Sequence, residues 1–160
     1  MTTYTERSKK AEMLFKEGYN CAQSVFLAFE DVHGMNRNTG AKLTSAMGGG
    51  MGRLREVCGC VSSMFLVLGL IEGCGPDDSD YAHEKKKKLY ETVQTLAAEF
   101  KQEHGSIICR ELLGRGDQAA AAGAEESAEP SLRTEDYYSR RPCADLCGFA
   151  VKTLEEYLNI

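Results

Sequence analysis

The sequence predicts an all-α fold, a bundle of five or six helices. Apolar residues recur at spacings of three and four through much of the chain, and no segment alternates apolar and polar residues over the length of a strand. Glycine, asparagine and proline stand where these segments begin or end, as they do at helix termini. A chain of 160 residues has the size of one domain, so residues 1–160 are expected to form a single helical domain.

Four helices are expected in the first part of the chain, over residues 4–17, 21–33, 38–47 and 57–72. The fourth is apolar nearly all round, which predicts the central, buried helix of the bundle. A Gly-rich loop at residues 48–53 precedes it, with glycine at 48, 49, 50 and 52. So many glycines favour a tight or left-handed backbone path over a helix interior.

The second part of the chain predicts a long helix over residues 80–104, one or two helical turns at 107–113 and a last helix over 142–158. Residues 114–131 are rich in alanine, glutamate and glycine and hold no large apolar side chain. We expect residues 114–134 to form a mobile Ala/Glu-rich internal loop, because such a segment has too little apolar surface to bury.

Charge and hydropathy exclude two classes of protein. With 19 basic and 24 acidic residues the net charge is −5, so a nucleic-acid-binding protein is not expected. We expect the four lysines at 85–88 to lie on the solvent-exposed face of a helix. The first residues form no apolar signal segment, and the longest apolar stretch, residues 61–71, is too short to cross a bilayer. The sequence therefore predicts a cytoplasmic protein without membrane insertion.

The seven cysteines indicate metal binding or redox chemistry. Structural disulfides are not expected, because cytoplasmic thiols are normally kept reduced. No Cys-x-x-Cys pair is present. Instead, four cysteines fall in the first turns of four different predicted helices: Cys21, Cys58, Cys109 and Cys143. Backbone N–H groups and the helix dipole favour a thiolate at such positions. If the four helix starts face one place, they line an electropositive pocket suited to an iron–sulfur cluster or to reactive thiols.

Arginines stand beside three of these cysteines and strengthen the expectation of lowered thiol pKa values. Arg55 precedes Cys58, Arg110 follows Cys109, and Arg140 and Arg141 precede Cys143.

The remaining cysteines carry weaker signals. Cys60 and Cys74 are expected to fill space in or beside the buried helix. Cys147 lies one turn beyond Cys143 on the same helix face, where it is a ligand, a resolving thiol or a packing residue.

The Gly-rich loop lacks the Lys-Ser/Thr ending of a nucleotide-binding loop. Its position next to Cys58 favours instead a turn that brings the backbone close to the cysteine site, with Gly49, Gly50 and Arg53 contributing to cofactor binding.

Four segments resemble, in order, the C_GCAxxG_C_C family, whose redox label is an inference from its cysteines. They are Tyr19-Asn20-Cys21-Ala22-Gln23, Gly48-Gly49-Gly50-Met51-Gly52-Arg53, Glu56-Val57-Cys58-Gly59 and Cys109-Arg110-Glu111-Leu112-Leu113-Gly114. The resemblance implies shared cysteines at Cys21, Cys58, Cys109 and Cys143, with Cys147 as the alternative fourth.

This chain departs from the family pattern in its Cys-Gly-Ala-x-x-Gly core. Cys60 replaces the alanine and Ser63 the second glycine, so Cys60 is a substitute ligand or a disulfide partner. A more distant resemblance, to the iron–sulfur part of split-Soret cytochromes, implies a [2Fe–2S]-type site.

Three functions follow as hypotheses. The first is an electron-transfer protein, of oxidoreductase type, in which Cys21, Cys58, Cys109 and Cys143 bind an iron–sulfur cluster that serves a redox partner protein. The second is a metal-free thiol–disulfide protein that uses the same four cysteines as redox thiols. The third is a small helical binding protein with a structural metal. The apolar content of the helices would permit a homodimer.

Overall fold

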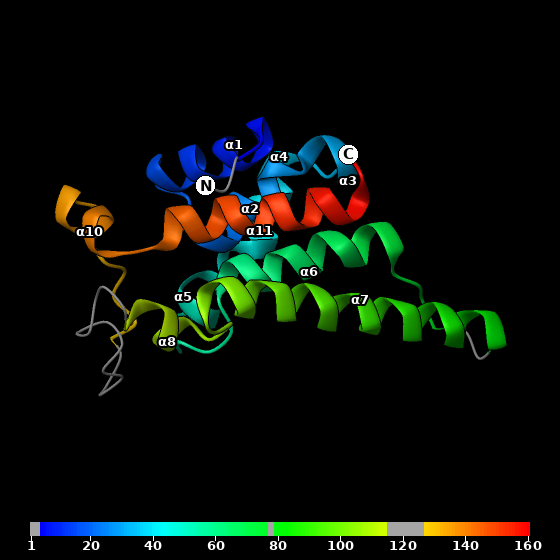
Figure 1. Ribbon diagram of the computed structural model, residues 1–160. Helices are drawn as coiled ribbons and strands as arrows, with labels where there is room; N and C mark the ends of the chain where they lie inside the picture. The colour runs from blue at the N-terminus through cyan, green and yellow to red at the C-terminus, as the bar shows by residue number, and fades with distance from the viewer. Residues whose placement is uncertain (1–3, 77–78, 115–126) are drawn as a thin grey trace.

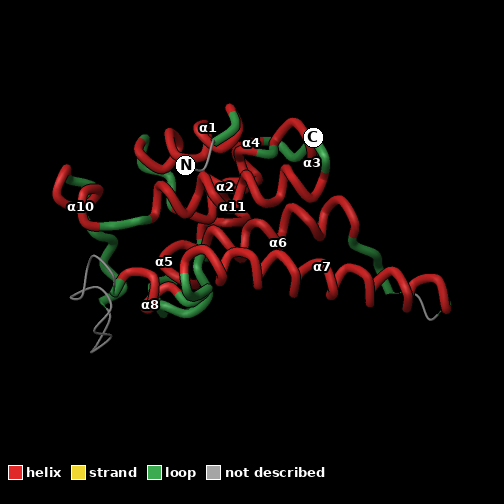
Figure 2. The backbone as a smooth tube through the Cα atoms, viewed as in Figure 1, coloured by secondary structure: helices red, strands yellow, loops and turns green. Residues whose placement is uncertain are grey.

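The computed structural model describes residues 4–76, 79–114 and 127–160, and within these ranges the chain is all-α, as predicted (Figures 1 and 2). Most of the predicted internal loop, residues 115–126, lies outside the described residues. The helices are α1 (Glu6–Lys16), α2 (Cys21–Ala28), α3 (Glu30–His33), α4 (Arg37–Ser45), α5 (Gly48–Met51), α6 (Gly59–Glu72), α7 (Asp80–His104), α8 (Cys109–Leu113), α10 (Glu135–Arg140) and α11 (Cys143–Leu158).

The body of the bundle is formed by α1, α2, α6, α7 and α11. The two ends of the chain meet, because α1 packs along α11, while α2 lies against α1, α6 and α11. Helix α7 runs beside α6 and α11 and carries its first turns beyond the rest of the bundle (Figure 1). The predicted central helix, α6, is buried along its first ten residues or so through Val61, Met64 and Leu68, whereas Leu70 and Ile71 at its end are exposed.

Three elements differ from the prediction. In the expected Gly-rich loop, residues 48–51 form the short helix α5, although Gly49 and Gly50 within it keep the predicted left-handed backbone. The helix expected over residues 21–33 is broken into α2 and α3 at Phe29, whose backbone (φ −104°, ψ 18°) leaves the helical region. Helix α10 was not predicted, since its six residues are too short to show an apolar period. It is set by a local signal, the side chain of Thr134, which accepts a hydrogen bond from the Tyr137 backbone N–H.

Three short helices, α5, α8 and α10, lie at one end of the bundle, whereas α3 lies at the other end, near the C-terminus (Figure 1). At the end with the three short helices, α5 and α8 lie beside the start of α6, and α10 leads into the start of α11. The bundle thus places several helix N-termini close together at this end. No helix in the described ranges is both long and apolar enough to span a membrane.

Candidate functional site

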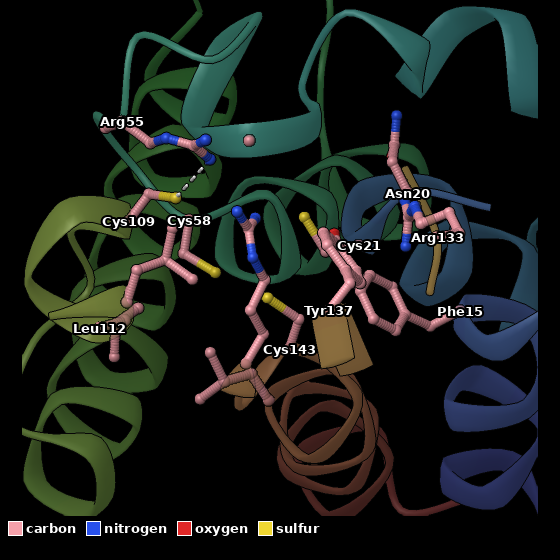
Figure 3. Close-up of a pocket in the computed structure, with 14 residues that line it drawn as sticks. Phe15, Asn20, Cys21, Arg55, Cys58, Cys109, Leu112, Arg133, Tyr137 and Cys143 are labelled. Carbon is pink, nitrogen blue, oxygen red and sulfur yellow. Dashed lines mark hydrogen bonds between the residues drawn. The ribbon is translucent and has the colours of Figure 1, made fainter. Parts of the chain in front are cut away.

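A small cavity at this end of the bundle is lined by the four cysteines that the helix-start pattern singled out (Figure 3). Its volume is about 50 Å³. The cysteines are Cys21, Cys58, Cys109 and Cys143, one each from the starts of α2, α6, α8 and α11. The structure therefore brings together thiols that are up to 122 residues apart, the distance from 21 to 143 in the sequence.

Each cysteine owes its place to a helix start. Cys21 is the first residue of α2, and Asn20 before it forms a capping box with Gln23. Cys58 is itself the N-terminal flanking residue of α6. Cys109 and Cys143 are the first residues of α8 and α11. At such positions the thiols lie where backbone N–H groups lack helical partners.

A short antiparallel pairing sets Cys58 beside Cys109. Val57 and Ile108 form an isolated β-bridge, the Cys58 N–H donates to the Ile107 carbonyl at 2.8 Å, and the Cys109 N–H donates to the Glu56 carbonyl at 2.6 Å. Because these bonds hold the two backbones in register, both thiols enter the cavity from the same wall.

The glycines of the loop let backbone and sulfur approach closely. Gly50 has a left-handed φ of +70°, and a Cβ there would lie 2.6 Å from the Cβ of Cys109. A Cβ at Gly59 would lie 2.6 Å from the Cys21 Sγ. Only glycine fits at either position without displacing a cysteine.

The three loop residues that sequence analysis named are placed differently from one another. Gly49 lines the cavity, and Gly50 makes room for Cys109. Arg53 lies outside the cavity wall, where its guanidinium donates to the Ser127 carbonyl at 2.8 Å and to the Ser131 hydroxyl at 3.0 Å. The arginine that does line the cavity is Arg55, two residues after the loop, which is only 2% exposed and places Nη1 3.9 Å from the Cys109 Sγ.

The opposite side of the cavity is closed by an aromatic and cationic layer. The Arg133 guanidinium lies over the rings of Phe15 and Tyr137, at 4.7 and 4.8 Å from their centroids. The Arg141 guanidinium lies over Tyr137 at 4.4 Å, so the tyrosine ring contacts two cations. The Tyr138 hydroxyl fixes this segment by hydrogen bonding to the Lys16 carbonyl at 3.2 Å.

Charge and hydrogen bonds favour the thiolate form at Cys21. The hydrogen bond from the Cys60 thiol, helped by the backbone N–H groups of Gly49 and Ala22 and by the charge of Arg133, lowers the pKa of Cys21 to about 6 against the opposing effect of burial. The helix-start pattern predicted the direction of this shift, and the backbone N–H groups contribute to it, but the largest cause, the Cys60 thiol, was not predicted.

At two other cysteines the prediction of a lowered pKa is wrong. Burial, reinforced by the nearby Cys58 and Cys21, raises the pKa of Cys109 to about 12 although Arg55 acts in the opposite direction. Burial also raises the pKa of Cys143 well above its usual value. Loss of hydration is the largest cause at both thiols, and the negative charge of the neighbouring cysteines raises both pKa values further.

The neighbouring arginines also act differently from the expectation. Arg110 donates to Glu56 and to the carbonyls of Leu54 and Arg55, so it stabilises the loop backbone. Arg140 pairs with Asp136 within α10.

The three remaining cysteines separate into a pair and a single residue. Cys60 and Cys147 are fully buried, and their Sγ atoms are 3.4 Å apart at the contact between α6 and α11. Cys74 is exposed, so the expectation that it fills space beside the buried helix is wrong for this residue. It follows the last turn of α6, beyond the packed part of that helix.

In the part of the chain that the structure describes, no group of three or more His, Cys, Asp or Glu side chains is arranged to hold a metal ion. This geometry does not support the hypothesis of a structural single-ion site. A cluster differs from a single ion because it brings its own iron and sulfide atoms between the protein ligands.

Sequence reasoning did not find part of the cavity wall. Arg133 and Phe15 carry no motif signal, because their roles depend on how α10 folds over α1. The pair of tyrosines at 137 and 138 next to two arginines was a visible signal, yet its place over the cavity comes from the fold.

The fold and the site define a small helical protein with a cavity that gathers four cysteines beside arginine side chains. The family model described as "Putative redox-active protein (C_GCAxxG_C_C)" matches residues 19–157. The chain therefore belongs to the C_GCAxxG_C_C family, as the ordered cysteine segments indicated. Comparison with curated proteins and with solved structures gives no match.

Proposed function

We propose that this protein transfers electrons by means of an iron–sulfur cluster held by Cys21, Cys58, Cys109 and Cys143. The observation that carries the proposal is the convergence of these four thiols, from four separate helix starts, on one small cavity. Four cysteine thiolates are the usual ligand set of [2Fe–2S] and [4Fe–4S] clusters. When bound, such a cluster supplies one-electron transfer.

The wall of the cavity suits an anionic group. Arg55, Arg133 and Arg141 line it, and the guanidinium of Arg55 is nearly fully buried beside the Cys109 sulfur. Backbone N–H groups of Gly49 and Ala22 are directed at the Cys21 sulfur. Positive charge and amide donors around sulfur ligands are the means by which a protein tunes such a centre.

The arginines of the cavity wall would also offset the free-energy cost of deprotonating several buried thiols. The raised pKa of Cys109 and Cys143 means that both are neutral thiols at pH 7 unless a cation replaces the proton. Binding a cluster therefore releases protons, and Arg55 and Arg141 remain to balance part of the thiolate charge.

Electrons would pass to and from a redox partner protein at the end of the bundle where the cavity lies. We place this exchange in the cytoplasm, because thiols there stay reduced and available as ligands.

Anaerobic purification with a near-ultraviolet and visible spectrum, and with iron and acid-labile sulfide analysis, tests the proposal. We expect a brown protein that dithionite bleaches. Serine variants of Cys21, Cys58, Cys109 and Cys143 should lose iron, whereas Cys74→Ser, at an exposed position away from the cavity, should keep it. A wild-type chain that holds neither iron nor sulfide after reconstitution would refute the proposal.

A second candidate function is metal-free thiol–disulfide exchange at the same cavity. It is favoured by the surroundings of Cys21, where backbone N–H groups and the Cys60 thiol stabilise a thiolate beside three further cysteines. Mass spectrometry of alkylated protein should then find a disulfide among the cavity cysteines that reductant removes and oxidant restores. Cavity thiols that stay unreactive toward alkylation in the folded protein would exclude this function.

A further inference from the structure

A second group of thiols lies behind the cavity, at the contact between α6 and α11. The Sγ atoms of Cys60 and Cys147 are 3.4 Å apart, and both residues have 0% exposure. The Cys147 thiol also lies 3.7 Å from the Cys21 carbonyl oxygen. The Cys60 thiol donates a hydrogen bond to the Cys21 sulfur. Three sulfurs therefore form a continuous chain from the cavity wall into the core, in the order Cys21, Cys60, Cys147.

We propose that Cys60 and Cys147 form a second redox site, a dithiol that converts reversibly to a disulfide and is oxidised through Cys21. This site goes beyond the proposed cluster, because neither cysteine lines the cavity. Because Cys21 is also a ligand of the proposed cluster, the exchange through Cys21 takes place in the cluster-free form of the protein.

The positions of the two cysteines favour a bond between them. A disulfide has an S–S distance of about 2.05 Å, so the two sulfurs, now 3.4 Å apart, must approach by roughly 1.3 to 1.4 Å for the bond to form. Cys60 lies in the second position of α6 and Cys147 one turn into α11, and these helices pack directly on each other. The partners are therefore held together before any oxidation occurs.

The solvent exposure of the three cysteines determines which of them an oxidant reaches first. An external oxidant does not reach Cys60 or Cys147 directly, since both are fully enclosed. Cys21 is 8% exposed and lines the cavity, so it is the member of the three that meets a molecule from solution. We take that molecule to be a low-molecular-weight disulfide, RSSR, of the glutathione class.

The oxidation of Cys60 and Cys147 takes place in three thiol–disulfide exchange steps. The Cys21 thiolate attacks RSSR, and RS⁻ leaves with two electrons, giving a mixed disulfide. The Cys60 sulfur then attacks the Cys21 sulfur, a second RS⁻ leaves, and the Cys21–Cys60 bond forms. Finally the Cys147 sulfur attacks Cys60 and releases Cys21 as a thiolate. The protons of Cys60 and Cys147 pass to the two RS⁻ groups, so the net products are one disulfide and two RSH.

The test uses the full-length chain, freed of any iron with a chelator, reduced, desalted and exposed to oxidised glutathione. Samples are quenched in acid, unfolded, alkylated and mapped by mass spectrometry over time. We expect a peptide pair joined through Cys60 and Cys147 that dithiothreitol removes. A fully oxidised cavity in which both Cys60 and Cys147 are still alkylated would overturn the proposal.

Three variants test the route. Cys21→Ser should slow formation of the Cys60–Cys147 bond by about tenfold or more, because the entry thiol is lost. Cys60→Ala should accumulate the Cys21 mixed disulfide, which reports the same step even if the variant is less stable. Cys74→Ser, at an exposed cysteine outside both sites, should behave as the wild type. An unchanged rate in Cys21→Ser would exclude Cys21 as the entry point. This test reads sulfur connectivity in iron-free protein, so its result is separate from the iron analysis.

Discussion

Gly50→Ala should destabilise the protein much more than Gly52→Ala. The difference between the two variants measures how tightly the glycine loop packs against Cys109. Both glycines have left-handed backbones, with φ of +70° and +58°. An added Cβ at Gly50 would meet the Cys109 Cβ at 2.6 Å and the Glu56 backbone N at 2.8 Å. At Gly52 the nearest atom is the Ala46 carbonyl oxygen at 3.9 Å, which is ordinary contact.

The magnitudes follow from two separate effects. A left-handed conformation costs an L-residue about 1–2 kcal/mol, and both variants bear this cost. Overpacking adds about 1–3 kcal/mol, and only Gly50→Ala bears it, because the atoms it meets belong to backbone and to a fixed cysteine Cβ. We therefore expect a loss of about 1–2 kcal/mol for Gly52→Ala and of about 2–5 kcal/mol for Gly50→Ala.

Urea unfolding followed by circular dichroism measures this difference. With a slope of about 2 kcal/mol per molar urea, the midpoint of Gly50→Ala should lie roughly 1 M below that of Gly52→Ala. Equal midpoints for the two variants would refute the reasoning, since they would mean that Cys109 moves aside at no cost and that the loop does not fix its position.

The other predictions concern thiol reactivity, a helix cap and the buried pair. In cluster-free protein, the rate at which iodoacetamide alkylates Cys21 should rise as the pH passes about 6 and then level off. Cys109 should stay unreactive at neutral pH, because its pKa is about 12. Peptide mapping across a pH series measures both rates. Asn20→Ala should cost about 1 kcal/mol or more in a denaturation experiment, because it removes both the cap oxygen and the Nδ2 hydrogen bond to the Ser45 carbonyl, and Asn20→Asp should restore only the cap. Oxidising Cys60 and Cys147 closes a loop of 87 residues, which should add about 4–5 kcal/mol and raise the melting temperature by roughly 9–18 °C; calorimetry with and without dithiothreitol measures the shift.

Local signals predicted most of the helices, because the residues that begin and end a helix act within a few positions. Asn20 and Ser79 cap α2 and α7, and Gly105 ends α7 with a φ of +83°. The break at Phe29 has no comparable marker, since glycine and proline are absent there and the tertiary packing of α2 decides where the helix turns.

The sequence predicted which cysteines line the candidate site, but it did not predict the pKa values of their thiols. Helix starts are readable from sequence, so the four cavity thiols could be named before the structure. Their protonation depends on burial and on neighbours that are distant in the chain, which is why Cys109 departs from the expectation. The contact between Cys60 and Cys147 was equally hidden, because it joins two helices that are 87 residues apart in the chain.

The order in which the cavity thiols occur along the chain has a consequence for synthesis on the ribosome. Cys21, Cys58 and Cys109 are translated first, and Cys143 follows 34 residues later, at the start of the helix that packs along α1. At about 5–20 residues per second, the third thiol, Cys109, is made roughly 2–7 s before the last one, and Cys21 and Cys58 are made earlier still. In nascent chains the four-cysteine cavity therefore stays incomplete until α11, which carries Cys143, has been synthesised.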